Sequence, residues 1–78
     1  MKKYIITINS QSPRLYTVEE VGGDGYGSYA VHDERDRIEP LNEDAQDSRL
    51  IAALRLGLRA QPKSVRSGQS WAVEVENE

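Results

Sequence analysis

The sequence predicts an α+β domain in which an antiparallel sheet of four to five strands carries one helix on one face. Short stretches of alternating apolar and polar residues, rich in β-branched side chains, occur on both sides of one helical stretch. That helical stretch, residues 44–60, repeats leucine every four positions. The length of 78 residues suits one compact domain spanning residues 1–78. The predicted order is β-β-β-(β)-α-β.

The first part of the chain is predicted to form three strands. Residues 3–9 and residues 15–21 alternate apolar and polar side chains, and a turn cluster separates them. Residues 28–32 give a third strand, which the glycine-rich residues 22–27 join to the second as a hairpin loop. The side chains expected to face the helix from these strands are Tyr4, Ile6, Ile8, Tyr16, Val18, Tyr29 and Val31.

Two further strands are predicted on either side of the helix. Residues 33–36 have the composition of a tight turn, and residues 37–39 form a short strand that Pro40 stops. Residues 71–76 alternate again, as in a half-buried strand. This last strand is expected to pair in parallel or to fill an edge beside the first strand. Trp71 begins it in phase with the apolar positions, which favours a core position over a binding hot spot.

The helix is predicted to begin between Asp44 and Ser48 and to end before Pro62, which cannot continue the backbone ladder. Asn, Asp and Ser residues suited to capping precede it. Gly57 lies beside the leucine stripe and costs about 1 kcal/mol against alanine, so close approach to a strand is its expected reason. The side chains expected to face the sheet are Leu50, Ile51, Leu54 and Leu58.

Charge is segregated along the chain although the net charge is only −3. Residues 33–47 contain seven acids and two arginines, a net charge of −5, whereas residues 48–66 contain five bases and no acid, a net charge of +5. On the predicted helix Arg55 and Arg59 lie together, away from the leucines. Such segregation can steer partners, although basic side chains can also pair with acids of the same domain.

No motif for catalysis, cofactor binding or metal binding is present in the sequence. The glycines Gly23, Gly25 and Gly27 lie between two predicted strands, so no helix N-terminus follows them to receive a phosphate. His32 is the only histidine, has no recognisable nucleophile beside it, and should face away from the helix. The chain has no cysteine. We therefore expect no enzyme activity, no cofactor and no metal.

The first residues do not form a targeting signal. The apolar run at residues 4–8 is too short for a signal peptide and has no cleavage-site pattern after it. No stretch is long enough to span a membrane. We expect a cytoplasmic protein. Because so small a core supplies little stability, partner binding or a homodimer is also expected.

Several features together resemble the small, cysteine-free, acidic α+β proteins carried by phages and mobile elements, including anti-CRISPR inhibitors. They are the length, the opening strand at residues 4–8, the single helix, and the ending Ser70-Trp71-Ala72-Val73-Glu74-Val75. These features are architectural, so no functional residue is carried over. The resemblance implies a non-enzymatic protein-binding inhibitor that occludes a surface of a host CRISPR effector complex.

The charged segments and one aromatic residue are the candidate partner-binding elements. Acidic side chains can engage a basic groove, and a tyrosine at the tip of the glycine-rich loop can act as an anchor. The candidate partner-binding residues are Glu34, Asp36, Glu39, Tyr26, Arg55 and Arg59.

Two alternative functions remain open from the sequence. The chain could bind nucleic acid directly through a basic helix face, with Arg55, Arg59, Lys63 and Arg66 contacting phosphates. It could also be an accessory subunit that completes a larger assembly.

Overall fold

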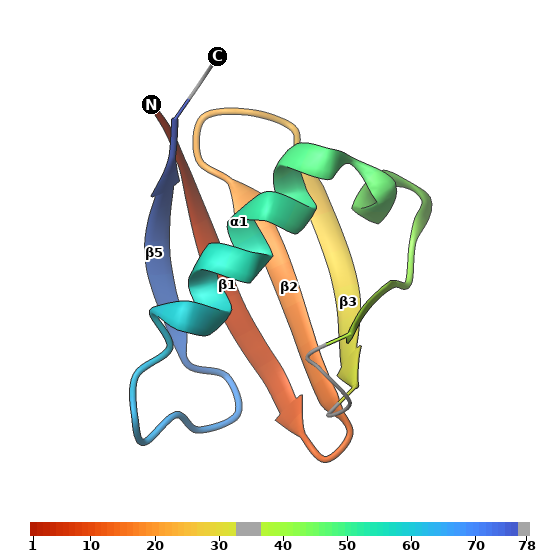
Figure 1. The fold of residues 1–78 in the computed structure, drawn as a ribbon, viewed down its shortest axis with the longest axis vertical. Helices are drawn as coiled ribbons and strands as arrows, with labels where there is room; N and C mark the ends of the chain where they lie inside the picture. Colours follow the sequence, from red (N-terminus) through yellow and green to blue (C-terminus); the bar gives the residue numbers. More distant parts are fainter. Residues whose placement is uncertain (33–36, 77–78) are drawn as a thin grey trace.

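An antiparallel sheet with a helix across one face forms the protein, as predicted (Figure 1). The computed structural model describes residues 1–32 and 37–76. In these residues five strands form one sheet in the order β4-β3-β2-β1-β5, and every neighbouring pair is antiparallel. The strands are β1 (Lys2–Gln11), β2 (Arg14–Glu20), β3 (Tyr26–His32), β4 (Arg37–Pro40) and β5 (Ser70–Val75). The α+β class and the order β-β-β-β-α-β are therefore confirmed.

Of the two placements expected for the last strand, the structure has the edge beside β1. β5 pairs antiparallel with β1, and Tyr4 lies opposite Val73. The reason is visible in Figure 1, where α1 (Ser48–Arg59) runs in the same sense as β1 and the chain then reverses direction. A strand that follows this reversal must enter the sheet antiparallel to β1.

The helix begins and ends where the sequence predicted. Residues Glu43–Gln46 form a short 3₁₀ helix, η2, and α1 begins at Ser48. Asp47 is the N-cap, and its carboxylate accepts a hydrogen bond from the backbone N–H of Arg49 at 2.9 Å. No helix in the described part of the chain is long and apolar enough to cross a membrane.

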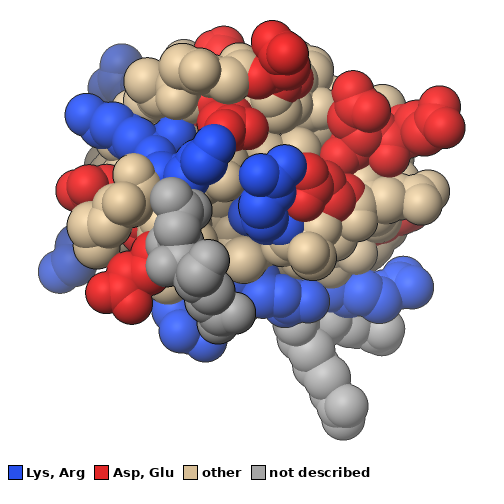
Figure 2. Space-filling view, turned by 90° about the horizontal axis from the view of Figure 1, so that it is seen from above, with Lys and Arg blue, Asp and Glu red and all other residues tan. Residues whose placement is uncertain are grey.

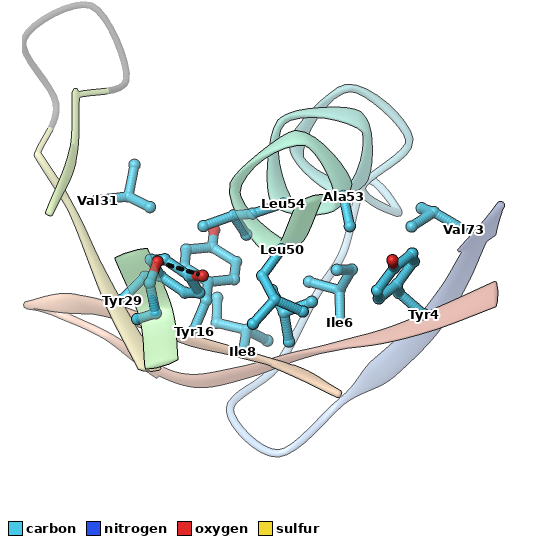
Figure 3. Close-up of a cluster of buried hydrophobic side chains, with 12 residues drawn as sticks. Tyr4, Ile6, Ile8, Tyr16, Tyr29, Val31, Leu50, Ala53, Leu54 and Val73 are labelled. Carbon is cyan, nitrogen blue, oxygen red and sulfur yellow. Dashed lines mark hydrogen bonds between the residues drawn. The ribbon is translucent and has the colours of Figure 1, made fainter. Parts of the chain in front are cut away.

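The core lies between α1 and the sheet (Figure 3). The seven residues of β1, β2 and β3 that were predicted to face the helix are all buried, and the alternating apolar positions of β5 are buried or partly buried. On the helix, Leu50 and Leu54 are buried, and Ile51 and Leu58 pack partly buried at the margin of the core. Ala53, which lies between Leu50 and Leu54 on α1, is also completely buried.

Gly57 lies where α1 approaches β1 closely, which confirms the expected reason for a glycine in the helix. A Cβ atom at Gly57 would lie 2.6 Å from Cγ1 of Ile6. The Gly57 carbonyl, one of those left without a helical partner at the end of α1, accepts a hydrogen bond from the indole N–H of Trp71 at 3.0 Å. Trp71 also meets Tyr16 edge-on, with ring centroids 6.5 Å apart. Trp71 therefore joins the partly buried margin of the core, in line with its predicted role.

Candidate partner-binding surface

The predicted partner-binding residues are spread over separate surfaces. Glu34 and Asp36 lie outside the described residues. Tyr26 is the first residue of β3 rather than the tip of the glycine-rich loop, because that strand begins two residues earlier than predicted. Tyr26 and Glu39 both alternate with core-facing positions, so both point to the sheet face opposite α1. On that face a carboxylate oxygen of Glu39 lies 2.7 Å from Nε2 of His32.

Arg55 and Arg59 lie on the outer side of α1, on the other side of the molecule from that sheet face. Both side chains are exposed. Within residues 1–32 and 37–76, neither guanidinium makes an ion pair or a side-chain hydrogen bond. In that part of the chain, these two arginines are therefore not neutralised by the domain's own acids.

A shallow acidic concavity lies at the end of the sheet where the β2–β3 loop meets η2 and the start of α1. Its volume is about 390 Å³, and its lining consists of Asp24, Gly25, Glu43, Asp44, Asp47 and Leu50. We call the four acids among these residues, Asp24, Glu43, Asp44 and Asp47, the acidic end. Figure 2 views the molecule from this side and shows acidic side chains gathered over one part of it, beside several Lys and Arg side chains.

Sequence reasoning found three members of the acidic end and missed the fourth. Glu43, Asp44 and Asp47 belong to the acidic segment noted in the sequence. Asp24 belongs to the glycine-rich loop, and the β2–β3 hairpin carries it to the concavity. Only knowledge of the hairpin's position relative to the helix start could have placed Asp24 there.

One of these four carboxylates is occupied by an internal partner. Asp47 accepts a hydrogen bond from Nη2 of Arg49 at 2.9 Å in addition to the capping bond from the Arg49 backbone. These bonds, the side-chain bond first, lower the pKa of Asp47, and Asp47 in turn raises the pKa of Arg49. Asp24, Glu43 and Asp44 are exposed, and their side chains have no ion-pair partner among the described residues. Within the described part of the chain, three negative charges are therefore available to a partner.

Two hydrogen bonds fix residues 41–47 to β3. The hydroxyl of the buried Tyr29 donates a hydrogen bond to the carbonyl of Ala45 at 2.8 Å (Figure 3). Burial, and then the negative charge of Asp47, raise the pKa of Tyr29 to about 12, so the phenol keeps its proton and remains a donor. Next to it, the backbone N–H of Leu41 donates to the carbonyl of Ser28 at 2.8 Å. The segment that carries Glu43, Asp44 and Asp47 is thus held on the sheet.

An ion pair between a buried carboxylate and a partly exposed lysine supports the loop that carries Asp24. Glu20 is only 8% exposed, and its carboxylate accepts a hydrogen bond from Nζ of Lys2 at 2.7 Å. This bond lowers the pKa of Glu20 against the opposing effect of burial. A Cβ atom at Gly23 would lie 2.5 Å from the Glu20 carboxylate, so the loop backbone rests directly on this group. Glu20 is in phase with the buried Tyr16 and Val18 of β2, and this alternation was the signal for its burial.

Comparison with known proteins gives no relative for this chain. No protein-family model matches it, and neither does a curated protein or a solved structure. Within the described residues, no group of three or more His, Asp or Glu side chains has an arrangement that could hold a metal ion. The function therefore has to be inferred from the chemistry of the surface.

Proposed function

We propose that the protein is a non-enzymatic binding protein whose acidic end occupies a basic surface of a protein partner. The observation that carries this proposal is the meeting of Asp24 with Glu43, Asp44 and Asp47 around one concavity. Three of these carboxylates have no ion-pair partner in the described part of the chain. Carboxylates presented in this way can contact the lysines and arginines that otherwise bind phosphates.

The class of partner that we propose is a CRISPR effector complex. Such complexes hold their guide and target strands in a positively charged channel, which an acidic protein can enter in place of nucleic acid. The small size, acidic character and α+β architecture support an inhibitor of the anti-CRISPR type, encoded by a phage or mobile element. Inhibition by occlusion requires no catalytic group, only contact with the same cations that the target DNA needs.

The anchoring of residues 41–47 favours this use. A binding surface that is already ordered loses less conformational entropy on association than a loop that must be fixed by its partner. The hydrogen bonds from Tyr29 to Ala45 and from Leu41 to Ser28 keep residues 41–47 against β3 before any partner binds. The acidic end can therefore present its charges in one arrangement.

Reversing three charges of the acidic end is expected to weaken inhibition about tenfold or more, since close interfacial charge pairs couple by about 1.5 kcal/mol or more. The variant is Asp24→Lys/Glu43→Lys/Asp44→Lys, which leaves the helix cap Asp47 in place. The measurement is fluorescence anisotropy of labelled target DNA binding to purified, guide-loaded effectors of several types, titrated with the protein.

The matched control makes the same total change of charge at the three C-terminal glutamates: Glu74→Lys/Glu76→Lys/Glu78→Lys. If both variants lose inhibition equally, charge acts only as long-range steering and the acidic end is not the contact surface. A third variant, Glu34→Lys/Asp36→Lys/Glu39→Lys, tests the surface predicted from the sequence, and unchanged binding would exclude it. If the unmodified protein leaves every effector tested uninhibited, the proposed partner class is wrong.

Direct nucleic-acid binding is the second candidate, and the exposure of Arg55 and Arg59 without ion pairs in the described residues favours it. The exposed Lys63 and Arg66 follow on the loop after α1. If these side chains contact phosphates, Arg55→Gln/Arg59→Gln should reduce the slope of log affinity against log salt by about 2. A gel-shift assay at low salt with duplex and single-stranded DNA and RNA measures this, and the absence of any shift for the unmodified protein removes this candidate.

A further inference from the structure

Large apolar side chains are exposed beside the acidic end. Val21 is 49% exposed, Tyr26 is 48% exposed and Leu41 is 51% exposed. Val21 directly follows β2, Tyr26 begins β3, and Leu41 directly follows β4. In the chain, Tyr26 comes two residues after Asp24 of the acidic end, and Leu41 comes two residues before Glu43. We call Val21, Tyr26 and Leu41 the apolar corner.

The strand register brings Tyr26 and Leu41 together on the sheet face opposite α1. Tyr29 pairs with Pro40 across β3 and β4, and the hydrogen bond from the Leu41 N–H to the Ser28 carbonyl extends this pairing by one residue. Leu41 therefore lies opposite Ser28, and Tyr26 is its diagonal neighbour, a separation that aromatic and long side chains bridge. The two side chains can form one contact area.

The side chain of Asn42 fastens the two segments that carry this pair. Its Oδ1 accepts a hydrogen bond from the backbone N–H of Ser28 at 2.7 Å, and its Nδ2 donates to the carbonyl of Tyr26 at 3.4 Å. One amide thus links the backbone beside Leu41 to the backbone of Tyr26. Exposed apolar side chains on a backbone fixed in this way are suited to binding, because little entropy is lost when they are buried.

We propose that Tyr26 and Leu41 form the hot spot of the partner interface, and that the partner presents an apolar surface bordered by lysine or arginine. This inference rests on the proposed function, because it places the anchor beside the acidic end. Electrostatic complementarity contributes specificity and association rate more than affinity, whereas a few well-packed residues, often including tyrosine, carry most of the binding energy. The acidic end and the apolar corner together therefore predict a partner surface that is both basic and apolar.

Selection of peptides from a random display library on the immobilised full-length protein tests this without knowledge of the natural partner. Enriched peptides are expected to carry lysine or arginine on either side of a large apolar residue. Synthetic copies of the most enriched peptides should bind Tyr26→Ala/Leu41→Ala about tenfold or more weakly than the unmodified protein. They should bind Leu56→Ala within about twofold, since Leu56 is an exposed leucine on α1, away from this corner.

Thermal unfolding of each variant establishes that it is folded, and NMR shift changes on adding peptide should concentrate at residues 21–28 and 41–47. The inference is overturned if no peptide is enriched above the empty support, if the enriched peptides lack basic residues, or if Leu56→Ala loses as much affinity as the double variant. Inhibition of a CRISPR effector is a separate readout. Basic apolar peptides that bind at this corner while no effector is inhibited would refute the proposed partner class and leave the corner assigned.

Discussion

Replacing Leu54 with alanine is expected to lower the free energy of unfolding by about 2–5 kcal/mol. Leu54 is completely buried in α1 and points into the core beneath the helix (Figure 3). The substitution removes buried apolar surface and leaves a cavity that the surrounding sheet and helix fill only in part. A domain of this length has a total stability on the order of 4–12 kcal/mol, so this single substitution removes a substantial fraction of it.

Urea unfolding followed by circular dichroism measures this loss, with an unchanged m-value as the sign that the unfolded states are comparable. Leu56→Ala is the matched control, because it makes the same chemical change two residues later in the same helix at a side chain that is 38% exposed. Its expected loss is within about 0.5 kcal/mol. Equal losses at the two positions would contradict the packing of α1 described above.

Valine at Gly57 is expected to cost about 3 kcal/mol, at the upper end of the usual range for an overpacked core. The added Cβ alone would lie 2.6 Å from Cγ1 of Ile6, and Ile6 is completely buried, so neither side chain has room to move. The two further methyl groups of valine increase the conflict. In an exposed helix position, by contrast, exchanging glycine for valine would change helix propensity by only a few tenths of a kcal/mol.

A double-mutant cycle that combines Gly57→Val with Ile6→Ala separates steric conflict from other effects. Removing the Ile6 side chain beyond Cβ opens the space that the introduced valine needs, so the double variant should be more stable than the sum of the two single changes predicts by about 1–3 kcal/mol. Leu56→Val is the control for a β-branched residue in α1. Additive costs at positions 6 and 57 would mean that the close approach of α1 to β1 is not what requires a glycine.

Much of the fold could be predicted because it depends on local periodicity. Alternation identified every described strand to within two residues at each end, and the spacing of Leu50, Leu54 and Leu58 identified the helix. Gly57 was informative because glycine lowers helix stability, so a glycine within a helix suggests that close packing leaves no room for a side chain. The position of β5 was left between two possibilities, since the pairing partner of a strand depends on the path of the whole chain.

The candidate surface was harder to predict because it joins residues that are distant in sequence. Asp24 lies near Glu43 and Asp44 only because the β2–β3 hairpin brings it there and η2 packs against β3. Tyr26 and Leu41 become neighbours only through the register of β3 with β4, which the alternation of apolar residues does not specify. Charge segregation was visible in the sequence, but the grouping of acidic and apolar side chains at one end of the sheet required the structure.

The Trp71 indole, which donates a hydrogen bond to the Gly57 carbonyl, can serve as an intrinsic fluorescent probe of helix docking. Trp71 is the only tryptophan in the chain, so selective excitation reports on one location, the junction of the helix end with β5 and Tyr16. Release of α1 from the sheet would expose the indole to water and shift its emission to longer wavelength. The acidic end lies at the opposite end of α1. A label-free emission spectrum can therefore show whether the helix stays docked while a partner binds at its other end.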